Sequence, residues 1–61
     1  MRTRINVADT ATVLLSMGWK MDADFMVTFV SPTAFDVDWF SASPMPTEAA
    51  IAAAAPNAAA N

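Results

Sequence analysis

Cysteine, histidine and tyrosine are absent from this chain of 61 residues, and glycine and lysine each occur once. Without cysteine there is no disulfide, and without cysteine or histidine the usual zinc sites cannot form. The single glycine, Gly18, excludes a glycine-rich phosphate loop. Serine nucleophiles lack the histidine base that usually activates them, and no motif around Lys20 replaces it. We therefore expect neither enzyme activity nor a cofactor.

Charge is also scarce, since three basic and six acidic residues give a net charge of −3. This balance is unlike that of a basic nucleic-acid surface. No apolar run approaches the roughly 20 residues that span a bilayer. The N-terminus carries Arg2 and Arg4 but lacks the apolar stretch of a signal peptide. We expect a soluble or assembly-bound chain without a transmembrane segment.

The hydrophobic residues are unevenly placed along the chain. Of the 11 that follow Ser43, nine are alanine, and alanine adds little buried area at about 25 cal/mol per Å². We predict one small unit in residues 1–43, with an N-terminal arm, and an extended Pro/Ala-rich tail in residues 44–61. So few bulky side chains give a chain of this length little surplus stability. We therefore expect contact with partner chains to order it.

Residues 1–17 give one clear and one ambiguous pattern. Residues 1–7 alternate between polar and apolar, which indicates an extended arm or an edge strand. Residues 9–17 carry Asp9 or Thr10 as a cap and Gly18 after the end, which favours a short helix. A strand is the alternative, because the same stretch also alternates at Val13, Leu15, Met17 and Trp19. We choose the helix, in which Ala11, Leu14, Leu15 and Gly18 share one face.

Residues 19–40 predict paired strands. Trp19–Met21 can begin a strand, and Asp22–Asp24 form a turn. Phe25–Val30 and Phe35–Phe40 alternate as strands, with a break at Ser31–Thr33 between them. The result is an antiparallel hairpin or meander, so the fold class is a small α+β unit.

The tail has its own pattern after the Pro44–Pro46 segment. Thr47 can cap a short helix with Glu48 in its first turn, where a negative charge suits the helix dipole. Ala49–Ala55 favours a helix, and Pro56 is expected to end it.

Four carboxylates form two Asp-x-Asp pairs, Asp22 with Asp24 and Asp36 with Asp38. Neighbouring strands could bring these oxygens together around Ca²⁺ or Mg²⁺. The regular spacing of a calcium loop is missing, however. We therefore favour a polar turn and a solvent-facing strand, and we expect no metal.

The aromatic residues are the most informative feature. Across a hairpin, Phe25 and Phe29 can meet Phe35 and Trp39 in one layer. The other face then carries Met26, Val30 and Phe40, which a short helix and an alanine tail can hardly cover. Exposed apolar patches of this kind mark interaction sites. The predicted partner-binding residues are Trp19, Phe25, Met26, Phe29, Val30, Phe35, Trp39, Phe40, Met45 and Ile51.

These observations favour a small non-catalytic structural or accessory subunit of a larger protein assembly. A virion component, such as a minor capsid or tail protein, is one class in which such chains occur. The alternative is a small regulatory or inhibitory module that folds alone and binds one partner.

Overall fold

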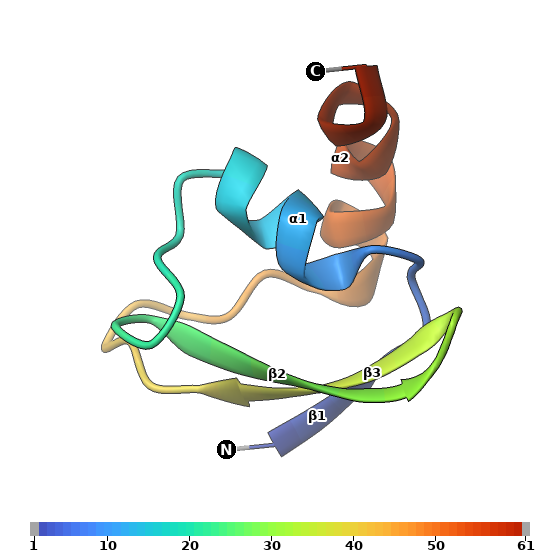
Figure 1. Cartoon of the computed structure of the whole chain (residues 1–61). Helices are drawn as coiled ribbons and strands as arrows, with labels where there is room; N and C mark the ends of the chain where they lie inside the picture. Colours follow the sequence, from blue (N-terminus) through green and yellow to red (C-terminus); the bar gives the residue numbers. More distant parts are fainter. Residues whose placement is uncertain (1, 61) are drawn as a thin grey trace.

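The sheet and the helices form two layers in the computed structural model, which describes residues 2–60. The elements in chain order are β1 (Arg2–Ile5), α1 (Thr10–Ser16), β2 (Phe25–Ser31), β3 (Ala34–Trp39) and α2 (Glu48–Ala60). The strands form one antiparallel sheet in the order β1-β3-β2. Both helices lie over the same face of the sheet, and no other helix or strand of residues 2–60 lies over the opposite face (Figure 1). The fold is therefore a small α+β unit.

The hairpin of β2 and β3 has the predicted pairing. Phe25 lies opposite Trp39, and Phe29 lies opposite Phe35, so these side chains share the face below the helices. Pro32 and Thr33 make the turn. The register shifts between Phe29 and Ser31, which leaves Val30 in a bulge beside the turn.

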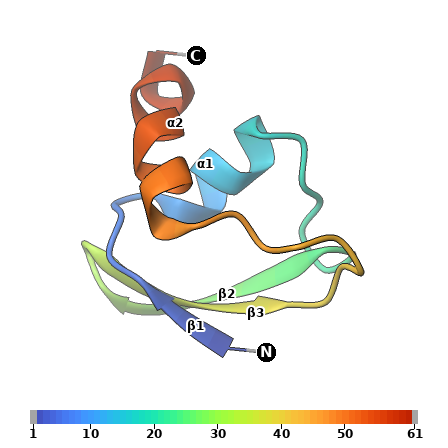
Figure 2. The same ribbon diagram turned by 180° about the vertical axis from the view of Figure 1, so that it is seen from behind.

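β1 is an edge strand, which is one of the two alternatives predicted for residues 1–7. It pairs antiparallel with β3, and Ile5 lies opposite Phe35. β3 therefore lies at the centre of the sheet. β2 is the edge nearer the viewer in Figure 1, and β1 is the nearer edge in the reverse view of Figure 2.

The segment before β2 differs from the prediction, because Trp19–Met21 begin no strand. Met21 makes an isolated bridge to Phe25 and nothing longer. The chain turns instead, because the Asp24 N–H donates to the Lys20 carbonyl at 2.8 Å and the Asp24 carboxylate accepts the Lys20 N–H at 2.9 Å. The turn predicted at Asp22–Asp24 is confirmed, and Asp22 has a left-handed φ of 67°.

The helix predicted within residues 9–17 is confirmed as α1, but its caps and buried face differ in part. Asp9 holds the N-cap position without a side-chain cap bond, and the Thr10 hydroxyl donates to the Val7 carbonyl. The buried residues are Thr10, Val13 and Leu14, whereas Leu15 is 48% exposed. Val13 and Leu14, rather than Leu14 and Leu15, are therefore the large side chains by which α1 enters the core.

Gly18 ends α1 in a Schellman motif. The N–H groups of Gly18 and Trp19 donate to the carbonyls of Leu15 and Leu14, at 3.1 and 3.2 Å. Gly18 has a φ of 98°, and no atom lies within 4 Å of the position of an added Cβ. A side chain there is therefore strained by its backbone alone.

Gly18→Ala is expected to lower the free energy of unfolding by about 1–2 kcal/mol, because an L-residue resists positive φ. Gly18→Asn should lose less stability, since asparagine tolerates positive φ better than alanine does. Urea unfolding followed by circular dichroism measures both variants. An alanine variant as stable as the native chain would contradict this conformation.

α2 begins as predicted and ends later than predicted. The Thr47 hydroxyl caps it by accepting the Ala50 N–H at 3.1 Å. Pro56 does not end the helix, which continues to Ala60. Proline removes one intrahelical donor, but Ala58 in the following turn packs against the core. That contact helps to hold the helix past the proline.

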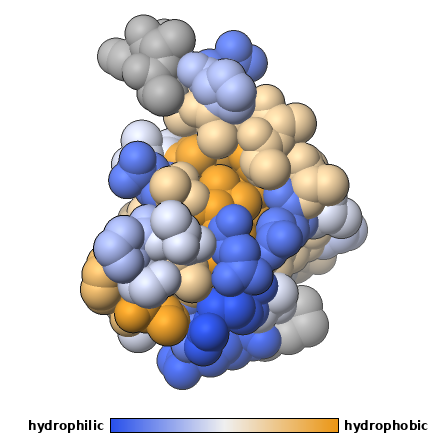
Figure 3. Space-filling view, turned by 90° about the vertical axis from the view of Figure 1, so that its right-hand side faces the viewer, coloured by the Kyte–Doolittle hydropathy of each residue, from blue (hydrophilic) through white to orange (hydrophobic). Residues whose placement is uncertain are grey.

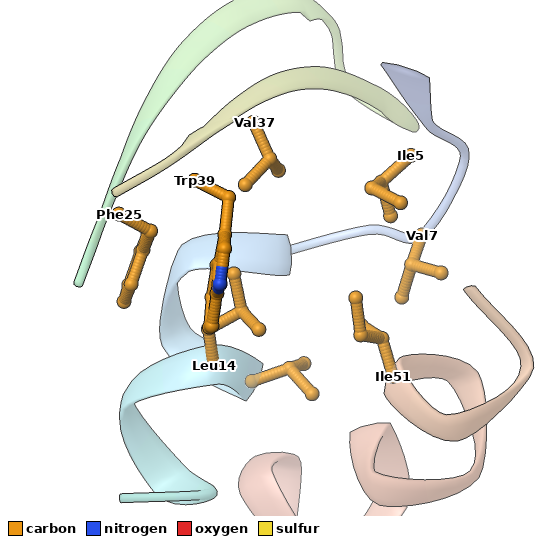
Figure 4. Packing of buried hydrophobic residues seen from close by; sticks show 8 residues of the cluster. Ile5, Val7, Leu14, Phe25, Val37, Trp39 and Ile51 are labelled. Carbon is orange, nitrogen blue, oxygen red and sulfur yellow. The ribbon is translucent and has the colours of Figure 1, made fainter. Parts of the chain in front are cut away.

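The core lies between the sheet and the helices (Figure 4). Its buried members are Ile5, Val7, Val13, Leu14, Phe25, Val37, Trp39 and Ile51. Ile51 corrects the expectation that residues after Ser43 add almost nothing to the core, because it is fully buried. The radius of gyration is 10.4 Å, and a folded chain of this length is expected to have about 10.5 Å. α2 is thus packed against the rest of the fold.

Candidate protein-binding surface

The outer side of the hairpin, away from the helices, carries exposed apolar side chains. Alternation along β2 places Met26 on this outer face, Val30 lies in the bulge near the end of β2, and Phe40 directly follows β3. Their side chains are 44%, 41% and 54% exposed, respectively. We call these three residues the outer patch. It corresponds to the uncovered face that the sequence predicted.

Ion pairs occupy the other side of the same face. Arg2 on β1 makes two hydrogen bonds to the Asp38 carboxylate on β3, at 3.0 and 3.1 Å, and Arg4 pairs with Asp36. The hydrogen bonds from Arg2 lower the pKa of Asp38. All of these groups are near the surface, so the pairs add little stability. Their effect is to fix the β1–β3 register and to give the outer patch a polar border.

Three of the four carboxylates in the Asp-x-Asp pairs have partners within the chain. Asp36 and Asp38 face arginines, and the Asp24 carboxylate accepts a backbone N–H from Lys20. Within residues 2–60 there is no group of three or more potential metal-ligating side chains. The two Asp-x-Asp pairs therefore form no shared cluster.

The structure divides the predicted partner-binding residues into three groups. Phe25, Trp39 and Ile51 are buried in the core and are not accessible to a partner in this conformation. Trp19, Phe35 and Met45 are half-buried. The remaining four, which are the members of the outer patch and Phe29, are exposed. The exposed residues lie on both faces of the hairpin, three in the outer patch and Phe29 on the helix side.

Phe29 has the largest exposed fraction among the large hydrophobic residues described, at 67%. It lies on the helix side of the sheet, near the turn, where it meets Phe35 edge to face with ring centroids 5.8 Å apart. The helices do not cover it. Phe29 therefore lies at the edge of β2, on the opposite side of the sheet from the outer patch.

Three further apolar side chains are exposed that the sequence did not assign to a surface. They are Leu15, Met17 and Met21, at 48%, 36% and 38%. The orientation of α1 determines the exposure of Leu15, and the loop after the helix determines that of Met21. Two sequence signals could have predicted this exposure. They are the helical spacing of Val13 relative to Leu15 and the turn residues at 22–24.

A groove of about 360 Å³ separates α1 from α2. It is lined by Ala8, Asp9, Thr12, Val13, Ala52, Ala55, Pro56 and Ala58. Hydrophobic surface fills the middle of the side shown in Figure 3, with hydrophilic surface below it. Asp9 and Thr12 supply the polar side chains of the groove, so it offers mainly an apolar, shallow contact area.

Comparison with known proteins adds no relative from which a role could be transferred. Over residues 2–60, neither helix has the length and apolar character that crossing a bilayer requires. No protein-family model, curated protein or solved structure matches the chain.

Proposed function

We propose that this chain is a small, non-catalytic accessory or structural subunit that binds another protein chain of a larger assembly through the outer patch. The observation that carries the proposal is the exposure of Met26, Val30 and Phe40 on a sheet face that no helix covers. Methionine and aromatic residues are enriched at the centres of protein interfaces, which have polar rims. The Arg2–Asp38 and Arg4–Asp36 pairs supply such a rim.

The energetics of the fold support the same conclusion. Removing apolar surface from water is favourable by about 25 cal/mol per Å². A chain with few bulky residues would gain from burying Phe40 and Met26 internally, yet both are exposed. Contact with a partner chain recovers this energy and explains why the side chains remain apolar. A virion component is one setting for such a subunit.

The proposal is tested with the double variant Met26→Thr, Phe40→Ser. Its stability should change by no more than about 0.5 kcal/mol per site, because both side chains lie outside the core. Its binding should be lost, because the apolar contacts are gone. Urea unfolding measures the first effect. Position 40 is changed in the double variant, so the second effect is measured with Met26→Thr alone. Site-specific photo-crosslinking in the source cells compares the native residue at position 26 with the Met26→Thr change, with the crosslinker at position 40 or, as the control, at the exposed Ala50.

The expected result is one saturable protein adduct from position 40, absent from position 50 and suppressed by the Met26→Thr change. Equal labelling from both positions would contradict the proposal. So would a double variant that loses more than about 2 kcal/mol, because the two residues would then serve the fold itself.

The second candidate is a regulatory or inhibitory module that folds alone. The observation in its favour is the shared core, to which both helices and all three strands contribute. Thermal unfolding of the purified chain separates the two candidates. A cooperative transition of a monomer, independent of concentration and well above physiological temperature, favours the module. A marginal transition that a partner chain raises favours the assembly subunit.

A further inference from the structure

The two edges of the sheet differ in length and in charge. β1 has four residues, and two of them are Arg2 and Arg4. β2 has seven residues and no charged side chain. Charged side chains, proline and short length are the usual protections of an edge strand against pairing with another chain. β1 is protected because it is short and carries two arginines. β2 has only one such feature, the bulge near its end.

Backbone groups in the middle of β2 point toward its free edge. On the side that faces β3, the Asp24 carbonyl accepts the Phe40 N–H at 2.8 Å. In an antiparallel ladder every second residue bonds to the partner strand, so the backbone groups of the residues of β2 with even numbers face β3. Residues of the opposite parity, Val27 and Phe29, therefore direct their N–H and C=O groups outward. Within residues 2–60, the loop before β2 covers only the start of this edge, where the Asp22 N–H donates to the Phe25 carbonyl.

We propose that β2 pairs antiparallel with β2 of a second copy of this chain, with a two-fold axis through Thr28. In this register Val27 lies opposite Phe29 of the second copy. By symmetry, Phe29 lies opposite Val27 of the second copy. All the outward N–H and C=O groups of both residues are then paired. Thr28 lies opposite the Thr28 of the second copy, on the outer face.

A second copy is the favoured partner because it presents the same uncharged free edge, and the two edges can pair about a two-fold axis. The axis lies midway between Val27 and Phe29, the two residues whose backbone groups are free. No like charges meet, because β2 has no charged side chain. Val27 of the second copy also covers Phe29, which is 67% exposed in the single chain.

The dimer has consequences for the rest of the molecule. A two-fold axis between antiparallel strands runs perpendicular to the sheet, so the helices of both copies lie on one face. The outer patches of both copies then lie on the other face and form one larger surface. Association also provides stability to a chain that has no cysteine and therefore no disulfide.

Thr28→Lys distinguishes the dimer from the single chain. Thr28 is exposed and lies opposite Asp36 within the sheet, so an ammonium group there is compatible with the single chain. Across the two-fold axis, the same group meets its own copy. We expect the dissociation constant of the dimer to rise roughly tenfold, because like charges directly opposite each other oppose pairing. Ala53→Lys, on the exposed face of α2, adds the same charge away from the edge and should have no effect.

Sedimentation equilibrium from roughly 1 µM to 1 mM covers the range of moderate affinities and measures the three proteins. Mixing Thr28→Lys with Thr28→Asp should restore the dimer, because opposite charges then meet at the axis. A native chain that is monomeric throughout, or a dimer that both lysine variants weaken equally, would overturn the pairing. Neither result affects the proposed function, which rests on the outer patch and is tested by the crosslinking from position 40.

Discussion

Trp39→Ala is expected to remove most or all of the stability of the isolated chain. Trp39 is 8% exposed, meets Trp19 edge to face at 4.7 Å and stacks on Phe25 at 6.4 Å. Its Nε1–H also donates to the Ser43 carbonyl at 2.7 Å. Replacing a buried tryptophan by alanine costs about 3–5 kcal/mol. A domain of this length has a total stability of about 3–9 kcal/mol, and its single core rarely supplies more than about 5 kcal/mol.

Urea unfolding followed by far-ultraviolet circular dichroism measures this loss without relying on tryptophan fluorescence. Trp39→Phe is the matched control, because it keeps an aromatic ring in contact with Phe25 and removes the hydrogen bond to Ser43. The free energy of unfolding should fall less in this control than in the alanine variant. If Trp39→Ala lost under 1 kcal/mol, the aromatic cluster would not be the centre of the core.

Ile51→Ala is expected to cost about 2–5 kcal/mol, which is the usual range for a buried isoleucine. Ile51 is 0% exposed and is the bulky side chain by which α2 enters the core (Figure 4). The helix has 13 residues, and isolated helices of that length are marginal in water. Loss of this contact should therefore loosen α2 together with the core.

Leu15→Ala is the control for this prediction, because it removes a similar volume from a side chain that is 48% exposed. It should lose clearly less stability than Ile51→Ala in the same urea titration. Equal losses would mean that α2 is not anchored through Ile51. Deletion of all residues after Ser43 removes the same anchor, so a truncated chain would report on folding as well as on partner binding.

The hairpin is the part of the fold that the sequence predicted best. Alternation in Phe25–Val30 and Phe35–Phe40 gave the facing pairs, and Ser31–Thr33 gave the break between the strands. These signals are local and depend on strand periodicity alone. The cap at Thr47 and the stop at Gly18 were predictable for the same reason.

Contacts between distant segments were not predictable in this way. The sequence indicates that Ile51 is apolar, but only the packing of α2 places it in the core. The pairs of Arg2 with Asp38 and Arg4 with Asp36 depend on the register of β1 against β3, 32–36 residues later. The helix continues past Pro56 because a tertiary contact at Ala58 opposes the local preference.

The candidate surface was predicted in outline. Strand alternation assigns Met26 and Phe40 to one face and Phe25 and Trp39 to the other. It does not say which face the helices cover. Once the helices cover the Phe25 face, that side becomes core and the Met26 face remains accessible. The position of the helices thus decided which aromatic residues form the surface.

The strand order β1-β3-β2 has a consequence for the route by which the chain folds. The first two strands to leave the ribosome, β1 and β2, have no pairing with each other and must wait for β3. β2 and β3 need to close only a tight two-residue reverse turn, whereas β1 must close a loop of about 30 residues at a larger entropic cost. We therefore expect the hairpin to nucleate assembly and the N-terminal strand to be recruited last.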